Sequence, residues 1–381
     1  MTEKEYWLYL AKIKGLGPGR RRVLLEIFGN PEGIYKAGEI TLRKIPLLED
    51  YHIEQILSLR NIDYEKELES FSSMGIRFIT SIDKDFPVRL KEIPDAPSFL
   101  FCKGELPDDN SPSVAIVGSR KCSIYGRETC LKFAEKLAGA GIVIISGMAA
   151  GVDGFAHRGA ISAGGKTIAV LGCGVDICYP SANRDIYDTL SKGNVLVRSA
   201  PGGQSSLPGH GCIISEYYPG EQALPYNFPQ RNRIISGLCD ILLVVEAGKK
   251  SGTFITVDHA LEQGREIFAI PGRIGDPVSD GCNSLIKNGA TIATEPEDII
   301  DELKQHYEML LIHEKRKKKD TVSKLEGDER KVFDCLEVVP LQINEISSRS
   351  GIDCGELSKI LISLELKGMV AEVGKNLYIR K

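Results

Sequence analysis

The chain has 381 residues with a formal net charge of −4, and 42% of them are hydrophobic and 26% charged. This length allows two or three domains with separate cores, and the charge excludes a uniformly basic nucleic-acid-binding protein while leaving room for a local basic groove. The N-terminus lacks an apolar signal segment, no apolar run approaches the about 20 residues of a membrane helix, and ten scattered cysteines without a C-x-x-C pair predict free thiols in a reducing cytoplasm.

Residues 1–75 have a helical pattern, with periodic apolar positions in "EYWLYLAKI" and "RRRVLLEIFG". Between these segments, "IKGLGPGRRR" places Gly15, Gly17 and Gly19 directly before Arg20–Arg22. The segment resembles a helix-hairpin-helix motif, in which backbone N–H groups approach a DNA phosphate. A glycine-rich turn with a solvated basic face explains the same residues equally well, so both interpretations stay open.

Residues 76–304 alternate short apolar segments with helical stretches. The predicted strands are "SVAIVG", "IVIISG", "TIAVLG", "CIISE", "DILLVVEA" and "EIFAIPG". Several are almost continuously apolar, which is typical of parallel strands buried on both faces. This pattern predicts a doubly wound, mostly parallel α/β sheet whose ligands bind outside the carboxyl ends of the strands.

Four glycine-rich turns follow predicted strands: "VGSRKCSIYG", "ISGMAAGVDGFAHRGAI", "GCGVDICYPSANRDIY" and "EAGKKSGTFITVDHAL". The first matches neither G-x-G-x-x-G nor G-x-x-x-x-G-K-[ST], so it is not a standard dinucleotide or P-loop site. Small residues permit close backbone approach to a ligand, and helix N-termini favour anions. Arg120, Lys121, Lys249 and Lys250 add positive charge. Together the turns predict one phosphate-binding crevice.

A further basic segment, "YNFPQRNRIISG", holds Phe228, Arg231 and Arg233. Guanidinium groups suit phosphate, and an aromatic ring offers a stacking face to a base. We expect this segment to be exposed and to precede a helix.

Catalytic groups are not prominent in the crevice. Asp153 and His157 stand four residues apart, and Glu216 and Glu246 end predicted strands. We expect Asp153 to cap its helix and His157 to pack on a neighbouring strand. No nucleophile and general base pair up, and no metal or cofactor site is predicted.

The remaining segments differ in texture. Residues 193–211, "GNVLVRSAPGGQSSLPGHG", are rich in Gly, Ser and Pro and predict a flexible loop. Residues 305–326 are charge-dense and predict a linker. Residues 327–381 contain three predicted helices, the third opening at an Asp N-cap, and then an alternating ribbon around Gly374. This order predicts a winged helix.

The order of the motifs named above, with "SEYYPG" and "GCNSLIKNGA", resembles the DprA (Smf) family of DNA-processing proteins over essentially the whole chain. The resemblance implies a non-enzymatic, cofactor-free homodimer with a Rossmann-like core that binds single-stranded DNA and loads RecA during natural transformation. The segment 193–211 is longer than the family usually has there. Carried onto this chain, the resemblance implies DNA contacts from Gly118, Ser119, Arg120, Ser146, Gly147, Gly151, Phe228, Arg231, Asn232, Arg233, Lys249, Lys250, Ser251, Gly252 and Thr253.

Two alternatives remain. The core is also similar to nucleotide phosphoribohydrolases, but Ile255 and Thr256 stand where those enzymes carry carboxylates, which argues against hydrolysis. The winged helix suggests a sequence-specific regulator. Its third helix, however, carries Lys359 and Lys367 among acidic residues, which favours protein contact or weak duplex binding.

Overall fold

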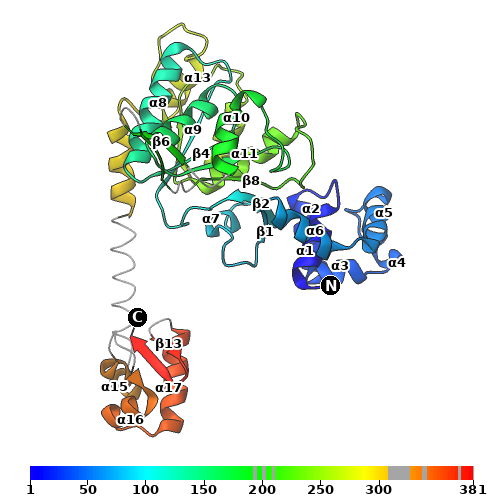
Figure 1. The fold of residues 1–381 in the computed structure, drawn as a ribbon, viewed down its shortest axis with the longest axis vertical. Helices are drawn as coiled ribbons and strands as arrows, with labels where there is room; N and C mark the ends of the chain where they lie inside the picture. The colour runs from blue at the N-terminus through cyan, green and yellow to red at the C-terminus, as the bar shows by residue number, and fades with distance from the viewer. Residues whose placement is uncertain are drawn as a thin grey trace. The chain divides into compact units, whose positions relative to one another are not determined.

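The computed structural model of the chain describes residues 1–191, 195–199, 203–207, 211–307, 327–336, 341–367 and 370–380. These residues divide into two compact units, Met1–Leu303 and Lys304–Lys381. The first unit holds the helical N-terminal segment and the α/β core, and the second holds the C-terminal helices and ribbon (Figure 1).

The N-terminal segment folds into short helices that pack around a cluster of tyrosines. The Thr2 hydroxyl accepts the Glu5 N–H at the start of α1, and the Asp63 carboxylate accepts the Lys66 N–H at the start of α6. Tyr9 is buried and packs edge-on against Tyr35 and Tyr64. The helices are α1 (Glu3–Lys12), α2 (Pro18–Phe28), α3 (Pro31–Lys36), α4 (Glu39–Leu42), α5 (Asp50–Ser58), η1 (Leu59–Asn61) and α6 (Tyr64–Ser73).

A nine-stranded sheet forms the centre of the first unit, in the order β1-β2-β8-β5-β4-β3-β9-β10-β11. The strands β8, β5, β4, β3, β9, β10 and β11 are parallel to one another. At one edge of the sheet, β2 is antiparallel to both of its neighbours, β8 and β1. The doubly wound prediction is therefore confirmed, and the antiparallel edge was not foreseen. The strands are β1 (Ile76–Thr80), β2 (Phe99–Gly104), β3 (Ser113–Val117), β4 (Val143–Ser146), β5 (Thr167–Val170), β8 (Gly211–Ser215), β9 (Ile241–Val244), β10 (Glu266–Ala269) and β11 (Thr291–Ile292).

Helices cover the sheet and bury the apolar strands (Figure 1). Alternate residues such as Ala115 and Leu242 join one core cluster with α7, α11, α12 and α13. The helices of the core are α7 (Val88–Lys91), α8 (Ile124–Gly139), α9 (Val152–Ser162), η2 (Ser181–Asn183), α10 (Arg184–Ser191), α11 (Asn227–Leu238), α12 (Thr253–Glu262) and α13 (Asp280–Lys287). A last helix begins at residue 296, and its described part ends at residue 307.

The N-terminal helices and the sheet share one hydrophobic core. Tyr9 and Phe71 belong to the same buried cluster as Phe101 of β2 and Tyr218. Phe71 contacts both Phe101 and Tyr218 with ring centroids 5.8 and 5.6 Å apart. The helical segment of residues 1–75 thus packs directly on the antiparallel edge of the sheet.

Two local predictions are wrong. The segment 193–211, expected as a loop, contains the antiparallel strands β6 (Val195–Ser199) and β7 (Gly203–Leu207), and β8 begins at Gly211. The segment around Phe228, expected to be exposed and to precede a helix, forms the first turns of α11, where Arg231 and Arg233 are buried. Pro229 is tolerated there because the first turn of a helix has no intrahelical partners for its N–H groups.

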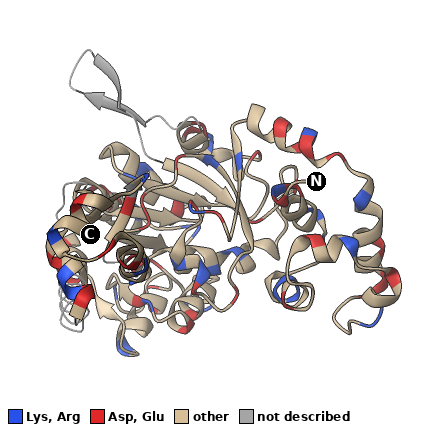
Figure 2. Ribbon diagram, turned by 90° about the horizontal axis from the view of Figure 1, so that it is seen from below, with Lys and Arg blue, Asp and Glu red and all other residues tan. Residues whose placement is uncertain are grey.

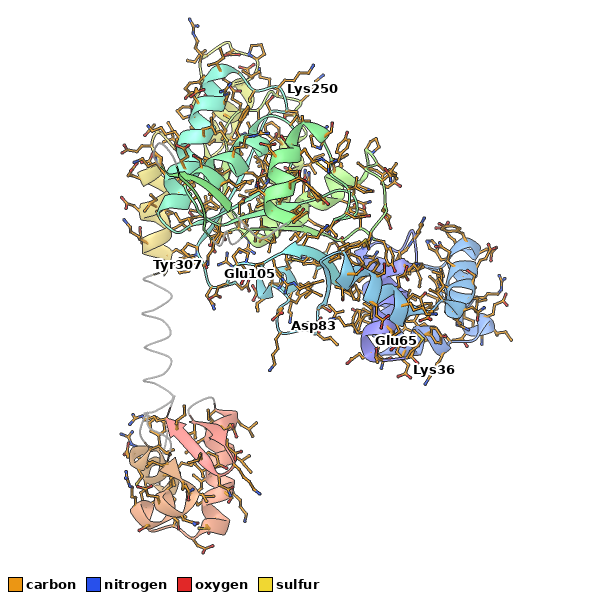
Figure 3. All side chains as sticks on the ribbon, in the orientation of Figure 1. Lys36, Glu65, Asp83, Glu105, Lys250 and Tyr307 are labelled. Atoms are coloured by element: carbon orange, nitrogen blue, oxygen red, sulfur yellow. The ribbon has the colours of Figure 1, made fainter. Side chains whose placement is uncertain are left out.

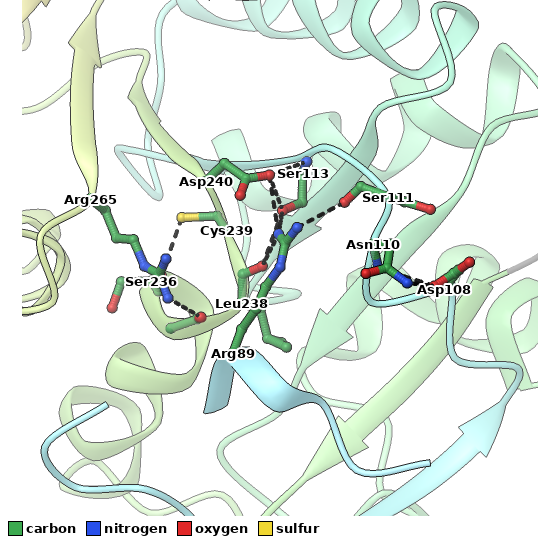
Figure 4. A network of polar contacts seen from close by, with 11 residues as sticks. Arg89, Asp108, Asn110, Ser111, Ser113, Ser236, Leu238, Cys239, Asp240 and Arg265 are labelled. Carbon is green, nitrogen blue, oxygen red and sulfur yellow. Dashed lines mark hydrogen bonds and ion pairs between the residues drawn. The ribbon is translucent and has the colours of Figure 1, made fainter. Parts of the chain in front are cut away.

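A polar network joins the amino ends of β3 and β9, on the side of the sheet opposite the strand tips (Figure 4). Asp240 accepts the Ser113 N–H at 2.8 Å and an Arg89 N–H at 3.1 Å. Arg89 also donates to the Leu238 and Ser111 carbonyls. The network fixes α7 against the central pair of strands.

The second unit is a winged helix, as predicted. Helices α15 (Gly327–Cys335), α16 (Ile343–Ser350) and α17 (Cys354–Leu366) pack with a small sheet in the order β12-β14-β13. Asp353 caps α17 by accepting the Gly355 N–H, and Gly351 ends α16 in the left-handed conformation. The strands are β12 (Leu341–Gln342), β13 (Val370–Gly374) and β14 (Leu377–Arg380).

Candidate functional site

The connection order of the sheet reverses between β3 and β9. The chain runs from β3 to β4, β5 and β8 on one side, and then returns to β9 on the other side of β3. Such a switch point leaves a crevice beyond the strand tips, where α/β proteins bind ligands. A pocket of about 540 Å³ lies there, lined by the turns after β3 and β9, the start of α9 and the first turns of α11 and α12. We call it the switch pocket.

The turn after β3 forms one wall of the switch pocket. The Ser119 N–H donates to the Glu246 carbonyl at 2.7 Å, which ties this turn to the end of β9. A Cβ atom on Gly118 would lie 2.9 Å from that same carbonyl oxygen, so the two turns meet in backbone contact. Arg120 and the next residue, Lys121, line the pocket with Gly118 and Ser119, and the Arg120 side chain is exposed.

The turn after β4 packs against the turn after β3. Gly151 has a φ of +77°, and a Cβ atom there would lie 2.3 Å from the Ser119 carbonyl oxygen. Ser146 is fully buried and donates its hydroxyl to the Ile116 carbonyl at 2.6 Å. Gly147 leaves room for the Arg231 guanidinium, because a Cβ atom would be 2.6 Å from Nη2. Ser146, Gly147 and Gly151 therefore shape the pocket without lining it.

The N-terminus of α8 is already occupied by a carboxylate. Glu246 is 2% exposed, and it accepts the Ser123 N–H at 2.8 Å together with the Ser123 hydroxyl. A Cβ atom on Gly126 would lie 2.3 Å from this carboxylate, so the helix accommodates it only with glycine there. The start of α9 likewise carries a carboxylate, that of Asp153, so an anion in the switch pocket is directed to the start of α12, which lies at its wall.

Helix α11 contributes Phe228, Pro229, Arg231, Asn232 and Ile235 to the pocket. The Arg231 guanidinium is buried and donates to the Gly147 carbonyl at 2.7 Å and to the Val170 carbonyl. Burial lowers the pKa of Arg231 and raises the pKa of the neighbouring Asp153. The attraction between the two charged side chains shifts both pKa values in the opposite direction, but by less. Arg231 therefore holds the ends of β4 and β5 and presents positive charge at the pocket floor.

Arg233 points away from the switch pocket. Its guanidinium donates to Glu216 at 2.6 Å, and Glu216 also accepts an N–H of Arg21 from α2 at 3.0 Å. Arg21 lies over the Phe99 ring. These three side chains form a buried ion-pair triad that joins α2, the end of β8 and α11.

The turn after β9 forms the opposite wall. Ser251, Gly252 and Thr253 line the pocket, and the Ser251 hydroxyl accepts the Thr253 N–H at 3.2 Å. Lys249 pairs with Asp280 at 3.4 Å outside the pocket. Lys250 is exposed on the surface of the core (Figure 3).

The glycine turn between α1 and α2 lies over a second cavity of about 1230 Å³. Its arginines all have protein partners: Arg20 pairs with Glu49, Arg21 with Glu216, and Arg22 donates to the Pro94 carbonyl. Figure 2 shows Lys and Arg side by side with Asp and Glu on the helices near the N-terminus. Only 11% of the Arg21 side chain is exposed and it is paired with Glu216, which fits neither a phosphate contact nor a solvated basic face for that residue.

The geometry gives little support to a catalytic or metal-binding role for Asp153 and His157. His157 is fully buried and hydrogen-bonds the Thr167 hydroxyl of β5 at 2.8 Å, as expected for packing on a strand. Asp153 lies in the first turn of α9, where its carboxylate accepts the Ala149 N–H at 3.3 Å, while Gly151 is the N-cap. Within the described part of the chain, no group of three or more His, Cys, Asp or Glu side chains could hold a metal ion.

Sequence reasoning missed two features of this region. Glu246 was noted only as a strand-end carboxylate, and its capping of α8 depends on a contact between residues 123 apart in the chain. Tyr179, which precedes η2, lies with its ring 5.6 Å from that of Phe228. The aromatic character of Tyr179 was the available signal, but nothing in its local sequence shows that it meets α11.

Comparisons with known proteins agree with this architecture. The family model of DNA recombination-mediator protein A matches residues 77–210 and 204–304, and that of the DprA winged helix domain matches residues 316–374. The DNA processing protein DprA of Streptococcus pneumoniae is 41% identical over 66% of this chain and 80% of that protein. Protein Smf of Synechocystis is 30% identical over 97% of both chains.

Two of the solved structures that are similar to this fold are DNA processing proteins. The DNA processing protein A of Streptococcus pneumoniae gives a TM-score of 0.64 at 36% identity, covering 79% of this chain and 98% of that one. DNA processing protein A of Helicobacter pylori, described for its single-stranded DNA binding mode, gives a TM-score of 0.51 at 27% identity over 61% of this chain and 98% of that one. Among the described residues of this chain, no helix has the length and apolar character needed to span a membrane.

Proposed function

The chain belongs to the DNA recombination-mediator protein A (DprA/Smf) family, and on that premise we propose that it binds single-stranded DNA through the switch pocket. The observation that carries the proposal is the convergence of two strand-tip turns and α11 on one polar pocket, with the exposed Arg120 at its wall. Its Helicobacter pylori relative binds single-stranded DNA.

The pocket suits a backbone phosphate. Small residues at Gly118, Ser119 and Gly252 let the ligand approach the main chain, and the start of α12 favours negative charge. Arg120 lies over the Phe228 ring, and its exposed side chain can reach a phosphate oxygen from there. Arg231 contributes charge from the floor, where its hydrogen bonds to carbonyl groups hold it in place. Phosphate contacts of this kind bind a strand with little regard to its sequence.

We propose that the bound strand is handed to RecA and that the protein acts as a homodimer in the cytoplasm, because the family resemblance implies these partners. A dimer with two switch pockets along one strand would gain affinity by avidity. We assign no catalytic role to the pocket. Ile255 and Thr256, which stand where phosphoribohydrolases carry carboxylates, both line it, so these two positions offer no acid to activate a glycosidic bond. The carboxylate that lines the pocket is Asp153, which lies beside Arg231 and accepts the Ala149 N–H.

A titration with three ligands tests the proposal. We expect the protein to bind an oligo-dT strand more tightly than a duplex of equal length, and to bind nucleoside monophosphates weakly without releasing free base. Preferential binding of a monophosphate with release of base would support the hydrolase alternative instead. Faster RecA filament formation on the protein-bound strand would support the mediator role.

A further inference from the structure

Phe228 is crowded by protein groups. The guanidinium carbons of Arg120 and Arg231 lie 5.3 and 5.8 Å from the centre of its ring. The ring edge rests on Gly172, where an added Cβ atom would be 3.1 Å from Cδ1. A base that stacked on Phe228 would compete with these neighbours. The ring instead provides a surface on which both arginines are held by cation–π attraction.

Tyr179 lies next to Phe228 and is far more open. Its ring centroid is 5.6 Å from that of Phe228, with 36° between the planes, and the side chain is 47% exposed. Phe228 lines the switch pocket, whereas Tyr179 is not among its lining residues. Tyr179 therefore presents an exposed aromatic surface beside Phe228, at the margin of the switch pocket.

Resting on the proposed function, we propose that Tyr179 is the residue that stacks on a base of the bound strand and that Phe228 positions Arg120. A nucleotide places its base to one side of its phosphate, so a phosphate beside Arg120 brings a neighbouring base within reach of Tyr179. Stacking is tolerant of sequence because every base has a π-face. The subsite therefore recognises an unstacked nucleobase rather than a particular sequence.

Paired substitutions on the full-length protein separate the two roles. Tyr179→Ala is expected to weaken binding of an oligo-dT strand about 5- to 150-fold, the effect of losing one stacked base. The same variant should bind an abasic strand of equal length as the unaltered protein does. Tyr179→Phe should restore oligo-dT binding, since the ring is what stacks. Phe228→Ala should weaken both strands alike, because it disturbs Arg120 rather than a base contact.

A matched control is Tyr51→Ala in α5, a tyrosine of similar exposure outside the pocket, which should leave both affinities unchanged. The proposal is overturned if Phe228→Ala removes the preference for the base-containing strand while Tyr179→Ala does not. Failure of the proposed function gives a different result, in which Arg120→Ala leaves binding of both strands unaltered.

Discussion

Gly151 and Gly252 illustrate how differently two glycines serve the same pocket. Gly151 has a φ of +77° and approaches the Ser119 carbonyl so closely that a Cβ atom would lie 2.3 Å from the oxygen. Gly252 has a φ of −60°, and nothing lies within 4 Å of the position of its Cβ atom. The fold therefore requires glycine at position 151 and does not require it at position 252.

We predict that Gly151→Ala lowers the free energy of unfolding by about 1–3 kcal/mol, because alanine must adopt a left-handed conformation against backbone atoms. Binding of single-stranded DNA should weaken with it, since the Ser119 turn must shift. Gly252→Ala is the control and should leave the stability unchanged or slightly raised. Urea unfolding of the two variants checks this, and equal stability would contradict the account of Gly151.

His157 makes the fold sensitive to acid. Burial lowers its pKa to about 3, whereas an unfolded chain has a histidine pKa of about 6.5. Between these values the unfolded state binds a proton that the folded state excludes. The contribution of His157 to stability is therefore complete above about pH 6.5 and is lost as the pH falls, by about 1.4 kcal/mol per unit.

Between pH 7 and pH 5 we expect this group to remove about 2 kcal/mol from the free energy of unfolding. The variant His157→Asn, which keeps a hydrogen-bonding group near Thr167, should lack that part of the pH dependence. Urea unfolding at the two pH values measures the difference. If both proteins lose the same stability on acidification, His157 is not neutral in the fold.

At the scale of elements, α11 connects the pocket to the N-terminal helices. Its first turns carry Phe228 and Arg231 to the switch pocket, and its next turn carries Arg233 to Glu216. Glu216 binds Arg21 of α2 in the same triad. The position of the pocket helix is thereby tied to a segment more than 190 residues earlier in the chain.

Removing the shared carboxylate should be costly. Glu216→Ala leaves two buried guanidinium groups without their partner, so we predict a loss of about 3–5 kcal/mol in the free energy of unfolding. Glu39→Ala is a matched control, because it breaks the exposed pair with Arg43 and should cost at most about 1 kcal/mol. Similar losses for the two variants would show that the triad adds no more than a surface pair.

The elements also show what the sequence could predict. The parallel strands and the winged helix follow from apolar runs, caps and glycine stops, which are local signals. The sequence predicts that α11 begins after the Phe228 segment, because Pro229 and the basic residues after it are typical of a loop, whereas the helix begins at Asn227. The destination of Arg233 could not be foreseen, since an arginine gives the same local signal whether it meets a phosphate or a distant carboxylate such as Glu216.

At the scale of the whole molecule, the sequence predicts the fold more completely than it predicts the site. The order of strands, helices and terminal ribbon agrees with the observed architecture. Of the residues expected to contact DNA, those that meet at one pocket are Gly118, Ser119, Arg120, Phe228, Arg231, Asn232, Ser251, Gly252 and Thr253. Lys250 is exposed and does not line it. Ser146, Gly147 and Gly151 shape it from beneath, and Arg233 and Lys249 pair with carboxylates elsewhere.

The second unit has little positive charge available on its third helix. Lys367 of the segment after α17 pairs with Glu329 at 2.6 Å. Ile362 and Leu366 of α17 are 56% and 85% exposed, one helical turn apart. These features fit the expectation of protein contact better than that of groove reading. They agree with the proposal that single strands bind to the first unit.

The most direct test of the phosphate-binding pocket is the salt dependence of oligo-dT binding by the unaltered protein, Arg120→Ala and Lys136→Ala. Lys136 is an exposed cation near the far end of α8, about 20 Å along the helix from the pocket, so its loss removes the same charge elsewhere. We predict that Arg120→Ala weakens binding about 10- to 100-fold and flattens the plot of log affinity against log salt by about 0.7, while Lys136→Ala leaves both unchanged. Affinities and slopes that are the same for the two variants would contradict the assignment of the switch pocket to the DNA backbone.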